Sequence, residues 1–276
     1  MKPVYAIVND DFVLHSEAQL RINDLAIQRG YGIFDFFKTI NSKPVFLDDH
    51  LDRFFASASK MNLQPGIDGP ALVEKLYALF EKNDIPDSGV RITLTGGYSH
   101  DGYTIVSPNL LITQSVFNHA PADFDKGIRL ITTEHQRQLP DVKTIDYLYA
   151  IYMQQKVKEQ NANDVLYVSG SQIRECPRAN FFIVSRNGEV HTPATKILKG
   201  ITRKKILAME EVDVRETDVS LGVLEGATEA FITSTTKYIL PVLAINGRPV
   251  GEGKPGPITR KIYSHIIELS TNQHRG

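Results

Sequence analysis

Residues 197–203 read ILKGITR, a glycine-centred loop that runs into the expected start of a helix. The amides of Ile201 and Thr202 would then lie in the first helical turn, where backbone N–H groups have no acceptor within the helix. Unpaired amides and the positive end of the helix dipole favour a phosphate. The stretch therefore predicts a phosphate cup; the alternative is an ordinary helix start capped near Thr202.

Two further segments offer groups for the same phosphate. Residues 233–236 read TSTT and follow an expected strand, so the hydroxyls of Ser234 and Thr235 come at a strand end. Arg53 lies in an expected amphipathic helix, and its guanidinium is a forked donor that suits phosphate. A polar turn and an exposed helical arginine are each common, so these groups count only together with the rest.

A lysine and a carboxylate stand in settings that suit catalysis. Lys143 lies in the stretch LPDVKTI, whose alternating apolar residues are typical of a strand that buries the amine. Burial favours the neutral, nucleophilic form of an amine. Glu175 comes shortly before an apolar strand, which would place its carboxylate at a buried edge. The alternatives are a solvated lysine, and a surface ion pair of Glu175 with Arg174 or Arg178.

These parts together are what an enzyme that uses pyridoxal 5'-phosphate (PLP) requires: a lysine to hold the cofactor, an acid that faces the pyridine nitrogen, and a cup for the phosphate. The acid keeps the pyridine nitrogen protonated, which makes the ring an electron sink for charge formed at the α-carbon of an amino acid. These parts fit PLP as the cofactor, with Lys143 and Glu175 in the first two roles, and the alternative given for each part stays open at this point.

The composition narrows the class of partner. With 31 basic and 32 acidic residues among 276, the net charge of −1 gives no electrostatic footprint for nucleic acid or an anionic membrane. The first residues lack the order of a signal peptide, and no apolar run approaches the roughly 18 residues that span a bilayer. We expect a cytoplasmic protein with small-molecule partners. The eight histidines form no ligand-like cluster and Cys176 is the single cysteine, so no metal site is expected.

The order of the expected elements indicates an α+β protein of two domains. A polar, proline-containing stretch at 117–125 is the expected linker between a small N-terminal α/β domain at 1–116 and a larger C-terminal cofactor-binding domain at 126–276. Strands are expected at 4–8, 32–40, 90–95, 110–112, 128–132, 165–168, 181–185, 230–233 and 238–242. Helices are expected at 47–61, after Asp68, near 146–160, after Gly200 and near 257–269.

Five segments, in this order, resemble the class IV aminotransferases, the fold-type IV PLP enzymes that include D-amino acid transaminases and branched-chain aminotransferases. They are residues 50–53 (HLDR), 142–144 (VKT), 175–180 (ECPRAN), 198–203 (LKGITR) and 233–236 (TSTT). The likeness implies two α/β domains with the cofactor site between them, and a homodimer. It also implies that Lys143 holds the cofactor and moves the substrate's proton, while Glu175 contacts the pyridine nitrogen. The other cofactor contacts that it implies are Leu198 on the ring and Arg53, Ile201, Thr202, Ser234 and Thr235 on the phosphate.

The substrate groups depart from those of the typical D-amino acid transaminase. Where that enzyme has an arginine-x-histidine trap for the substrate carboxylate, this chain has YSHD at 98–101. Three arginines in segments that the family fold brings near the cofactor, Arg29, Arg91 and Arg178, are the expected replacements. The alternatives are a loop ion pair for Arg29, an outward strand position for Arg91 and an ion pair with Glu175 for Arg178.

The expected activity is a ping-pong transfer of an amino group between an amino acid and a 2-oxo acid. A strand similar to the one that begins at Arg91 occurs in a less typical subgroup of D-amino acid transaminases, which favours a D-amino acid. A branched-chain L-amino acid aminotransferase and a PLP lyase resembling aminodeoxychorismate lyase are the alternatives, because they share the cofactor segments. Selectivity for D or L substrates depends on pocket shape, so these alternatives stay open, as does action of Arg29 across a dimer interface.

Overall fold

The computed structural model describes residues 2–118 and 124–272, which form two compact units. The first unit comprises residues 1–119 together with 142–146, and the second comprises 120–141 and 147–276. Residues 142–146, which include Lys143, thus group with the first unit although the second unit flanks them in sequence. The linker expected at 117–125 falls largely on 119–123, which lie outside the described residues.

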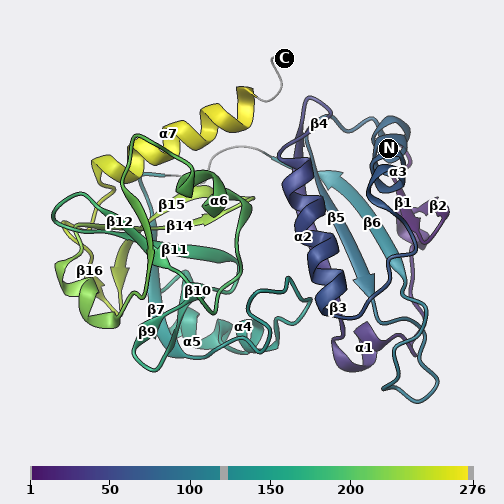
Figure 1. Ribbon diagram of the computed structural model, residues 1–276, viewed down its shortest axis with the longest axis horizontal. Helices are drawn as coiled ribbons and strands as arrows, with labels where there is room; N and C mark the ends of the chain where they lie inside the picture. The colour runs from purple at the N-terminus through teal and green to yellow at the C-terminus, as the bar shows by residue number, and fades with distance from the viewer. Residues whose placement is uncertain (1, 119–123, 273–276) are drawn as a thin grey trace. The chain divides into compact units, whose positions relative to one another are not determined.

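The first unit is a six-stranded sheet with helices on one face (Figure 1). The strand order is β2-β1-β6-β5-β3-β4 and all the pairings are antiparallel. The elements are β1 (Tyr5–Val8), β2 (Asp11–Leu14), η1 (His15–Glu17), α1 (Leu25–Arg29), β3 (Gly32–Ile40), β4 (Lys43–Pro44), α2 (Leu47–Lys60), α3 (Gly69–Asn83), β5 (Ser88–Thr95) and β6 (Leu110–Val116).

Alternation along β3 explains how the first unit builds its core. Ile33 and Phe37 point to one face, where they join apolar side chains of α2 and α3 in a single buried cluster. On α2, Leu51, Phe54 and Ala58 supply that cluster at helical spacing. The expected cap is confirmed too, because an Asp68 side-chain oxygen accepts the Ala71 N–H at 2.9 Å at the start of α3.

The segment that carries Lys143 extends this sheet at the open edge of β3. Phe34 N–H donates to the Lys143 carbonyl at 3.0 Å and Ile145 N–H donates to the Gly32 carbonyl at 3.1 Å, with Thr144 paired opposite Ile33. The sequence predicted a strand here, and the structure shows a short bridge instead. The approach is close at Gly32, where a Cβ would come within 2.9 Å of the Leu94 carbonyl oxygen.

The second unit is a ten-stranded mixed sheet. Its order is β13-β12-β11-β14-β15-β7-β8-β9, with β10 added on β11 and β16 on β15. The strands are β7 (Ile128–Glu134), β8 (Asp164–Ser169), β9 (Gln172–Ile173), β10 (Glu175–Cys176), β11 (Ala179–Val184), β12 (Val190–Pro193), β13 (Val214–Thr217), β14 (Glu229–Ser234), β15 (Tyr238–Ile245) and β16 (Arg248–Pro249). The helices are α4 (Leu148–Tyr152), α5 (Gln154–Glu159), α6 (Ile201–Leu207), η2 (Leu221–Gly226) and α7 (Pro257–Asn272).

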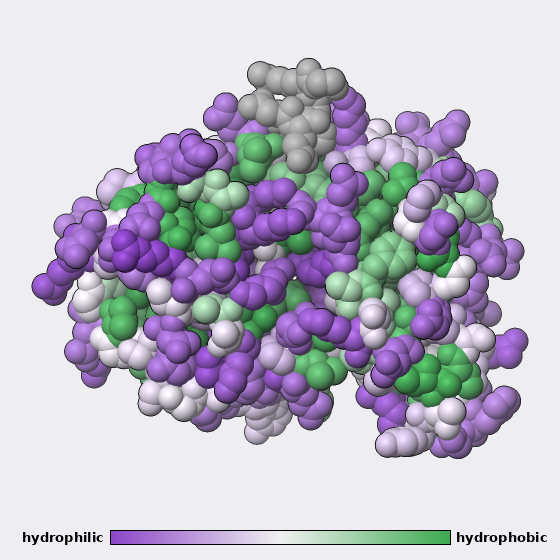
Figure 2. Space-filling view, viewed as in Figure 1, coloured by the Kyte–Doolittle hydropathy of each residue, from purple (hydrophilic) through white to green (hydrophobic). Residues whose placement is uncertain are grey.

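Two apolar clusters lie on opposite faces of the β11–β14 part of this sheet. Phe182 and Phe231 stack at 4.8 Å between ring centroids and pack with α6 and α7, whereas Phe181 and Ile232 belong to the other cluster. The helix expected near 146–160 is divided at Met153 into α4 and α5. Polar side chains cover much of the surface seen in Figure 2, with smaller apolar patches among them. Within the described residues, no helix combines the length and apolar character needed to cross a membrane.

Candidate functional site

A row of polar side chains crosses three strands of the second unit. Glu175 on β10 is paired with Asn180 on β11, and Asn180 is paired with Thr233 on β14. Directly opposed residues of antiparallel strands project to the same face, so the three side chains form one row. All three are buried. The row brings together parts of the 175–180 and 233–236 segments that lie far apart in sequence.

The loop before α6 is held against this row by side chain to backbone hydrogen bonds. Leu198 N–H donates to Glu175 Oε2 at 3.0 Å, and Asn180 Nδ2 donates to the Leu198 carbonyl at 2.7 Å. Gly200 lies so close that a Cβ there would collide with Asn180 Oδ1. The glycine is required by this close approach and not by its φ angle, which is −69°. Glu175 and Asn180 therefore fix the backbone of the predicted cup.

The cup itself carries donors that fit a phosphate. The helix α6 begins at Ile201, and the amides of Ile201 and Thr202 make no hydrogen bond with the described residues. The Thr233 hydroxyl is buried and likewise has no partner among them. Leaving such a group unsatisfied costs about 1–3 kcal/mol, so this hydroxyl would be stabilised by a ligand oxygen placed within reach of it. The amides, the hydroxyl and the Gly200 cradle fit the phosphate of PLP.

In the hydroxyl-rich turn after β14, Ser234 and Thr235 differ in their contacts. Ser234 Oγ accepts the Lys237 N–H at 3.2 Å and lies 3.3 Å from Thr236 Oγ1, so it stabilises the turn. Thr235 is half-buried. Ser234 and Thr235 were the phosphate contacts predicted from sequence. Thr233 belongs to the same TSTT segment, and the structure shows that it lies on the polar row.

Glu175 also has a partner that was not predicted from sequence. Arg137 Nε donates to Glu175 Oε1 at 2.9 Å, and the two side chains are 16% and 6% exposed. The alternatives considered from sequence were Arg174 and Arg178, which are neighbours in the chain. Arg137 is remote in sequence and lies in no segment of the resemblance, so spacing alone could not identify it.

Arg53 is anchored in the first unit by a buried carboxylate. Asp35 on β3 accepts from Arg53 Nε and Nη2, each at 2.8 Å, and lies 2.6 Å from His50 Nδ1. Burial alone would raise the pKa of Asp35, but Arg53 and His50 outweigh it and hold that pKa well below its usual range. Burial lowers the pKa of His50, against the opposing effect of Asp35. Arg53 Nη1 makes no hydrogen bond with the described residues, which leaves it as a donor for an anion.

Lys143 and Arg91 share one aromatic side chain. The Lys143 Nζ lies 4.5 Å from the centre of the Phe34 ring, and the Arg91 guanidinium carbon lies 4.1 Å from it. The strand register explains why Arg91 reaches Phe34. Arg91 on β5 is paired with Phe36 on β3, and Phe36 points to the same face of β3 as Phe34. Cations gain from such contact with a ring face. Arg91 is thus exposed on the same face of the sheet as Lys143, away from the α2 side on which Asp35 lies.

Lys38 is a buried amine farther along this face of β3. It is 1% exposed, its Nζ lies 5.8 Å from the centre of the Phe117 ring, and burial lowers its pKa to about 7 from an ordinary value of 10.5. Between pH 7 and pH 10.5, Lys38 therefore binds more protons in the unfolded chain than in the folded one. The free energy of unfolding should therefore rise with pH above about 7, by up to about 1.4 kcal/mol per unit.

We expect Lys38→Met to remove this rise. Urea unfolding at pH 7, 8 and 9 measures it, with exposed Lys254→Met as the control that keeps the wild-type slope. Equal slopes in wild type and Lys38→Met would contradict the assignment.

The other two predicted substrate arginines occupy different settings. Arg29 ends α1, donates from Nη1 to the Gln28 carbonyl at 2.9 Å, and precedes Gly30, whose φ of +67° is the left-handed cap of that helix. Arg178 lies at the turn of the β10–β11 hairpin and makes no hydrogen bond or ion pair with the described residues. The alternative considered from sequence, an ion pair between Arg178 and Glu175, is therefore not seen among the described residues.

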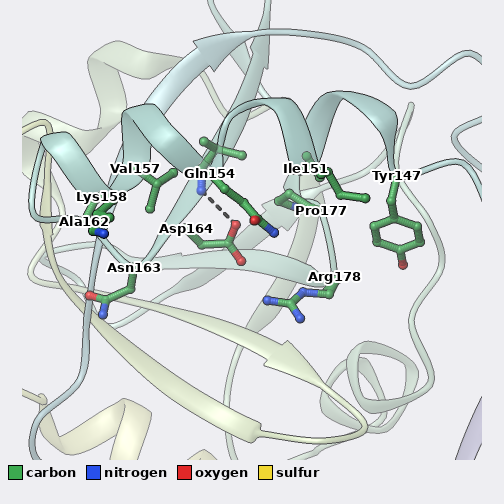
Figure 3. Close-up of a pocket in the computed structure, with 12 residues that line it drawn as sticks. Tyr147, Ile151, Gln154, Val157, Lys158, Ala162, Asn163, Asp164, Pro177 and Arg178 are labelled. Atoms are coloured by element: carbon green, nitrogen blue, oxygen red, sulfur yellow. Dashed lines mark hydrogen bonds between the residues drawn. The ribbon is translucent and has the colours of Figure 1, made fainter.

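Arg178 lines a groove of about 500 Å³ in the second unit. Figure 3 shows its guanidinium on the side of the groove where Asp164 lies, with Tyr147 and Ile151 on the opposite wall. Burial raises the pKa of Asp164, and the Val165 amide and Arg178 oppose that shift. The groove thus combines an apolar wall with a carboxylate and a guanidinium.

Comparisons with known proteins agree with this fold. Residues 32–245 match the family described as "Amino-transferase class IV". The chain is 33% identical over 279 residues to a D-alanine aminotransferase of Listeria monocytogenes serotype 4b, covering 95% of this chain and 94% of that one. It is 28% identical over 268 residues to the D-alanine aminotransferase of Bacillus licheniformis, covering 94% and 95%.

Solved structures show the same fold. The branched-chain amino acid aminotransferase from Escherichia coli matches with a TM-score of 0.87 at 23% identity, covering 99% of this chain and 96% of that chain. The PLP-bound form of a hypothetical aminotransferase from Mycobacterium tuberculosis matches with a TM-score of 0.82 at 19% identity, covering 98% and 100%.

The family match, together with a cup whose donors fit a phosphate, defines a PLP-binding enzyme. The chain belongs to the class IV aminotransferase family. It is a PLP-dependent aminotransferase, as the resemblance implied, and its α+β fold is confirmed.

Proposed function

We propose that this aminotransferase moves the amino group of a D-amino acid to a 2-oxo acid by a ping-pong mechanism. The observation that carries the proposal is the placement of Arg91 and Lys143 on one sheet face, both in contact with Phe34. A guanidinium on the sheet face that carries the reactive amine, with strand β3 between the two residues, can bind a substrate carboxylate while the amine reaches the α-carbon. The two relatives described above, which carry the name D-alanine aminotransferase, support the D-amino acid.

The chain's own residues divide the work as follows. When bound, PLP supplies the electron sink for charge formed at the α-carbon. Lys143 Nζ holds the cofactor and moves the α-proton, and Glu175 accepts the hydrogen bond of the pyridine nitrogen. Leu198 packs on the ring. The phosphate contacts are Arg53 through Nη1, the amides of Ile201 and Thr202, and the hydroxyls of Ser234, Thr235 and Thr233.

Three arginines are proposed to recognise substrate. Arg91 binds the α-carboxylate, and Arg29 and Arg178 supply the remaining positive charge for the substrate's carboxylates. Arginine is suited to this role because its planar fork forms two parallel hydrogen bonds with a carboxylate.

We also propose a cytoplasmic homodimer. On α4, Leu148, Ile151 and Tyr152 are 79%, 62% and 75% exposed, an apolar surface that a second copy would cover. In that dimer Arg29 acts in the partner's site. Light scattering should give twice the 30.9 kDa mass of the chain.

A half-reaction screen tests the activity. D-alanine and D-glutamate should convert the bound cofactor to its pyridoxamine form, seen as loss of the visible absorbance band. L-leucine should do so far more slowly. Conversion by L-leucine alone would favour a branched-chain aminotransferase, and pyruvate formed from aminodeoxychorismate without an amino acceptor would favour a lyase.

Replacing Arg91 tests its role in the same assay. Arg91→Met should lower kcat/KM for D-alanine by at least about 30-fold, because truncating one partner of a charge-paired contact costs about 2 kcal/mol or more. Arg91→Lys should recover only part of the loss, since a lysine offers no fork. The matched control is Arg260→Met, which also removes a guanidinium from a ring face, 4.8 Å from the Phe124 centroid, and should leave kcat/KM unchanged. Equal effects in both variants would contradict the role of Arg91.

A further inference from the structure

We propose that Arg137 is a positioning residue that orients Glu175 and keeps it anionic toward the cofactor's pyridine nitrogen. The inference rests on the proposed role of Glu175. Its direct observation is the hydrogen bond of 2.9 Å from Arg137 Nε to Glu175 Oε1, between two largely buried side chains.

Both carboxylate oxygens of Glu175 accept a hydrogen bond. Its Oε1 accepts from Arg137 and its Oε2 accepts from the Leu198 amide at 3.0 Å. Because each oxygen has a donor, rotation of the carboxylate would break both bonds. An ionised carboxylate has about four acceptor positions, so it can still accept the pyridine nitrogen's hydrogen bond.

The other end of Arg137 holds the chain that leads to the cofactor lysine. Its Nη2 donates to the carbonyl of Pro140, three residues before Lys143 in sequence. Gln136 Nε2 in turn donates to the carbonyls of Arg137 and Lys196, which ties the two segments together. One guanidinium thus connects the carboxylate of Glu175 with the stretch that precedes Lys143.

The charge of Arg137 has a chemical consequence. A guanidinium in contact with a buried carboxylate favours its ionised form. Without Arg137, the carboxylate would compete for the proton that it shares with the pyridine nitrogen. A proton retained by Glu175 would weaken the electron sink, so Arg137 affects the reaction through Glu175 and not through contact with substrate.

A double-mutant cycle of Arg137→Met and Glu175→Gln tests this coupling. We would measure the PLP dissociation constant by titrating the apoenzyme, and the pH dependence of the holoenzyme's visible absorbance band. At metal sites, partners that orient a ligating side chain contribute about 10- to 100-fold in affinity. We expect Arg137→Met to weaken PLP binding by about tenfold and to shift the pH profile in the wild-type background. In the Glu175→Gln background the same change should alter affinity by less than about twofold.

Two further variants separate positioning from folding. Arg137→Lys keeps the charge and should restore the pH profile in part. Arg174→Met removes the neighbouring buried arginine, which donates to the Ser169 carbonyl at 3.4 Å, and should leave the profile unchanged. If Arg137→Met fails to yield folded apoenzyme, as judged by thermal unfolding, Arg137→Lys replaces it in the cycle.

The outcomes distinguish the inference from the function on which it rests. Equal effects of Arg137→Met in both backgrounds, or an unshifted pH profile in the single variant, would overturn the positioning role. If Glu175→Gln itself changed neither PLP affinity nor the spectrum, the proposed role of Glu175 would fail first.

Discussion

Lys143→Ala should abolish transamination, with kcat at least about 10⁴-fold lower than in wild type. The structure places its Nζ over the Phe34 ring. The backbone of its segment is held to β3 by two hydrogen bonds, from the Phe34 N–H to the Lys143 carbonyl and from the Ile145 N–H to the Gly32 carbonyl. These bonds involve only main-chain atoms, so alanine keeps them. The substitution removes the amine while the segment that presents it stays in place.

The measurements combine turnover, the absorbance change with D-alanine, and attachment of the cofactor after borohydride reduction, read by mass spectrometry of the peptide that contains Lys143. Lys254→Ala removes an exposed lysine paired with Glu252 and should behave as wild type in all three. Borohydride attachment of the cofactor at another lysine, or undiminished turnover in Lys143→Ala, would disprove the assignment.

Regular alternation and helical spacing sufficed to predict most of the large elements. The strand expected at 32–40 is β3, and the helices expected at 47–61 and after Asp68 are α2 and α3. Short elements such as β10 and β16 carry too few residues for a periodic pattern. The bridge of Thr144 to Ile33 was unpredictable for another reason. It depends on which edge of β3 stays open, a property of the sheet and not of residues 142–146.

The site shows the same division between local pattern and tertiary pairing. The loop before α6 was identified locally, because glycine followed by a helix start leaves amides unpaired. Arg137 and Asp35 were missed, since each has a role only through a partner brought close by folding. In the sequence, Asp35 is only a charged residue inside an apolar strand. Its role becomes clear in the structure, where it pairs with Arg53 and His50. Buried charges of this kind are the residues that a search by motif overlooks.

Replacing Asp35, the buried carboxylate of the first unit, should have the second large effect, a loss of stability. Asp35→Ala should lower the free energy of unfolding by about 3–5 kcal/mol, because it leaves the Arg53 guanidinium largely buried and unpaired. Asp35 is fully buried and accepts two bonds of 2.8 Å from Arg53. PLP affinity should fall as well, since the guanidinium loses the carboxylate that orients Nη1. Urea unfolding of the apoenzyme and PLP titration measure the two losses separately.

The pH dependence and a double variant test the reason for this loss. The folded-state pKa of Asp35 lies below its unfolded value, so its stabilisation is present above about pH 4 and is lost only as the pH falls through the folded value. The difference between wild type and Asp35→Ala should therefore stay constant from pH 7 to 8, and it should widen at lower pH because Asp35 favours the protonated form of His50. Combining Asp35→Ala with Arg53→Met should cost clearly less than the sum of the single variants, because the unpaired cation is removed too. Additive losses would mean that burial of the side chain, and not its pairing with Arg53, stabilises this part of the sheet. Asp48→Asn, an exposed change in the first turn of α2, is the matched control and should alter stability by at most about 1 kcal/mol.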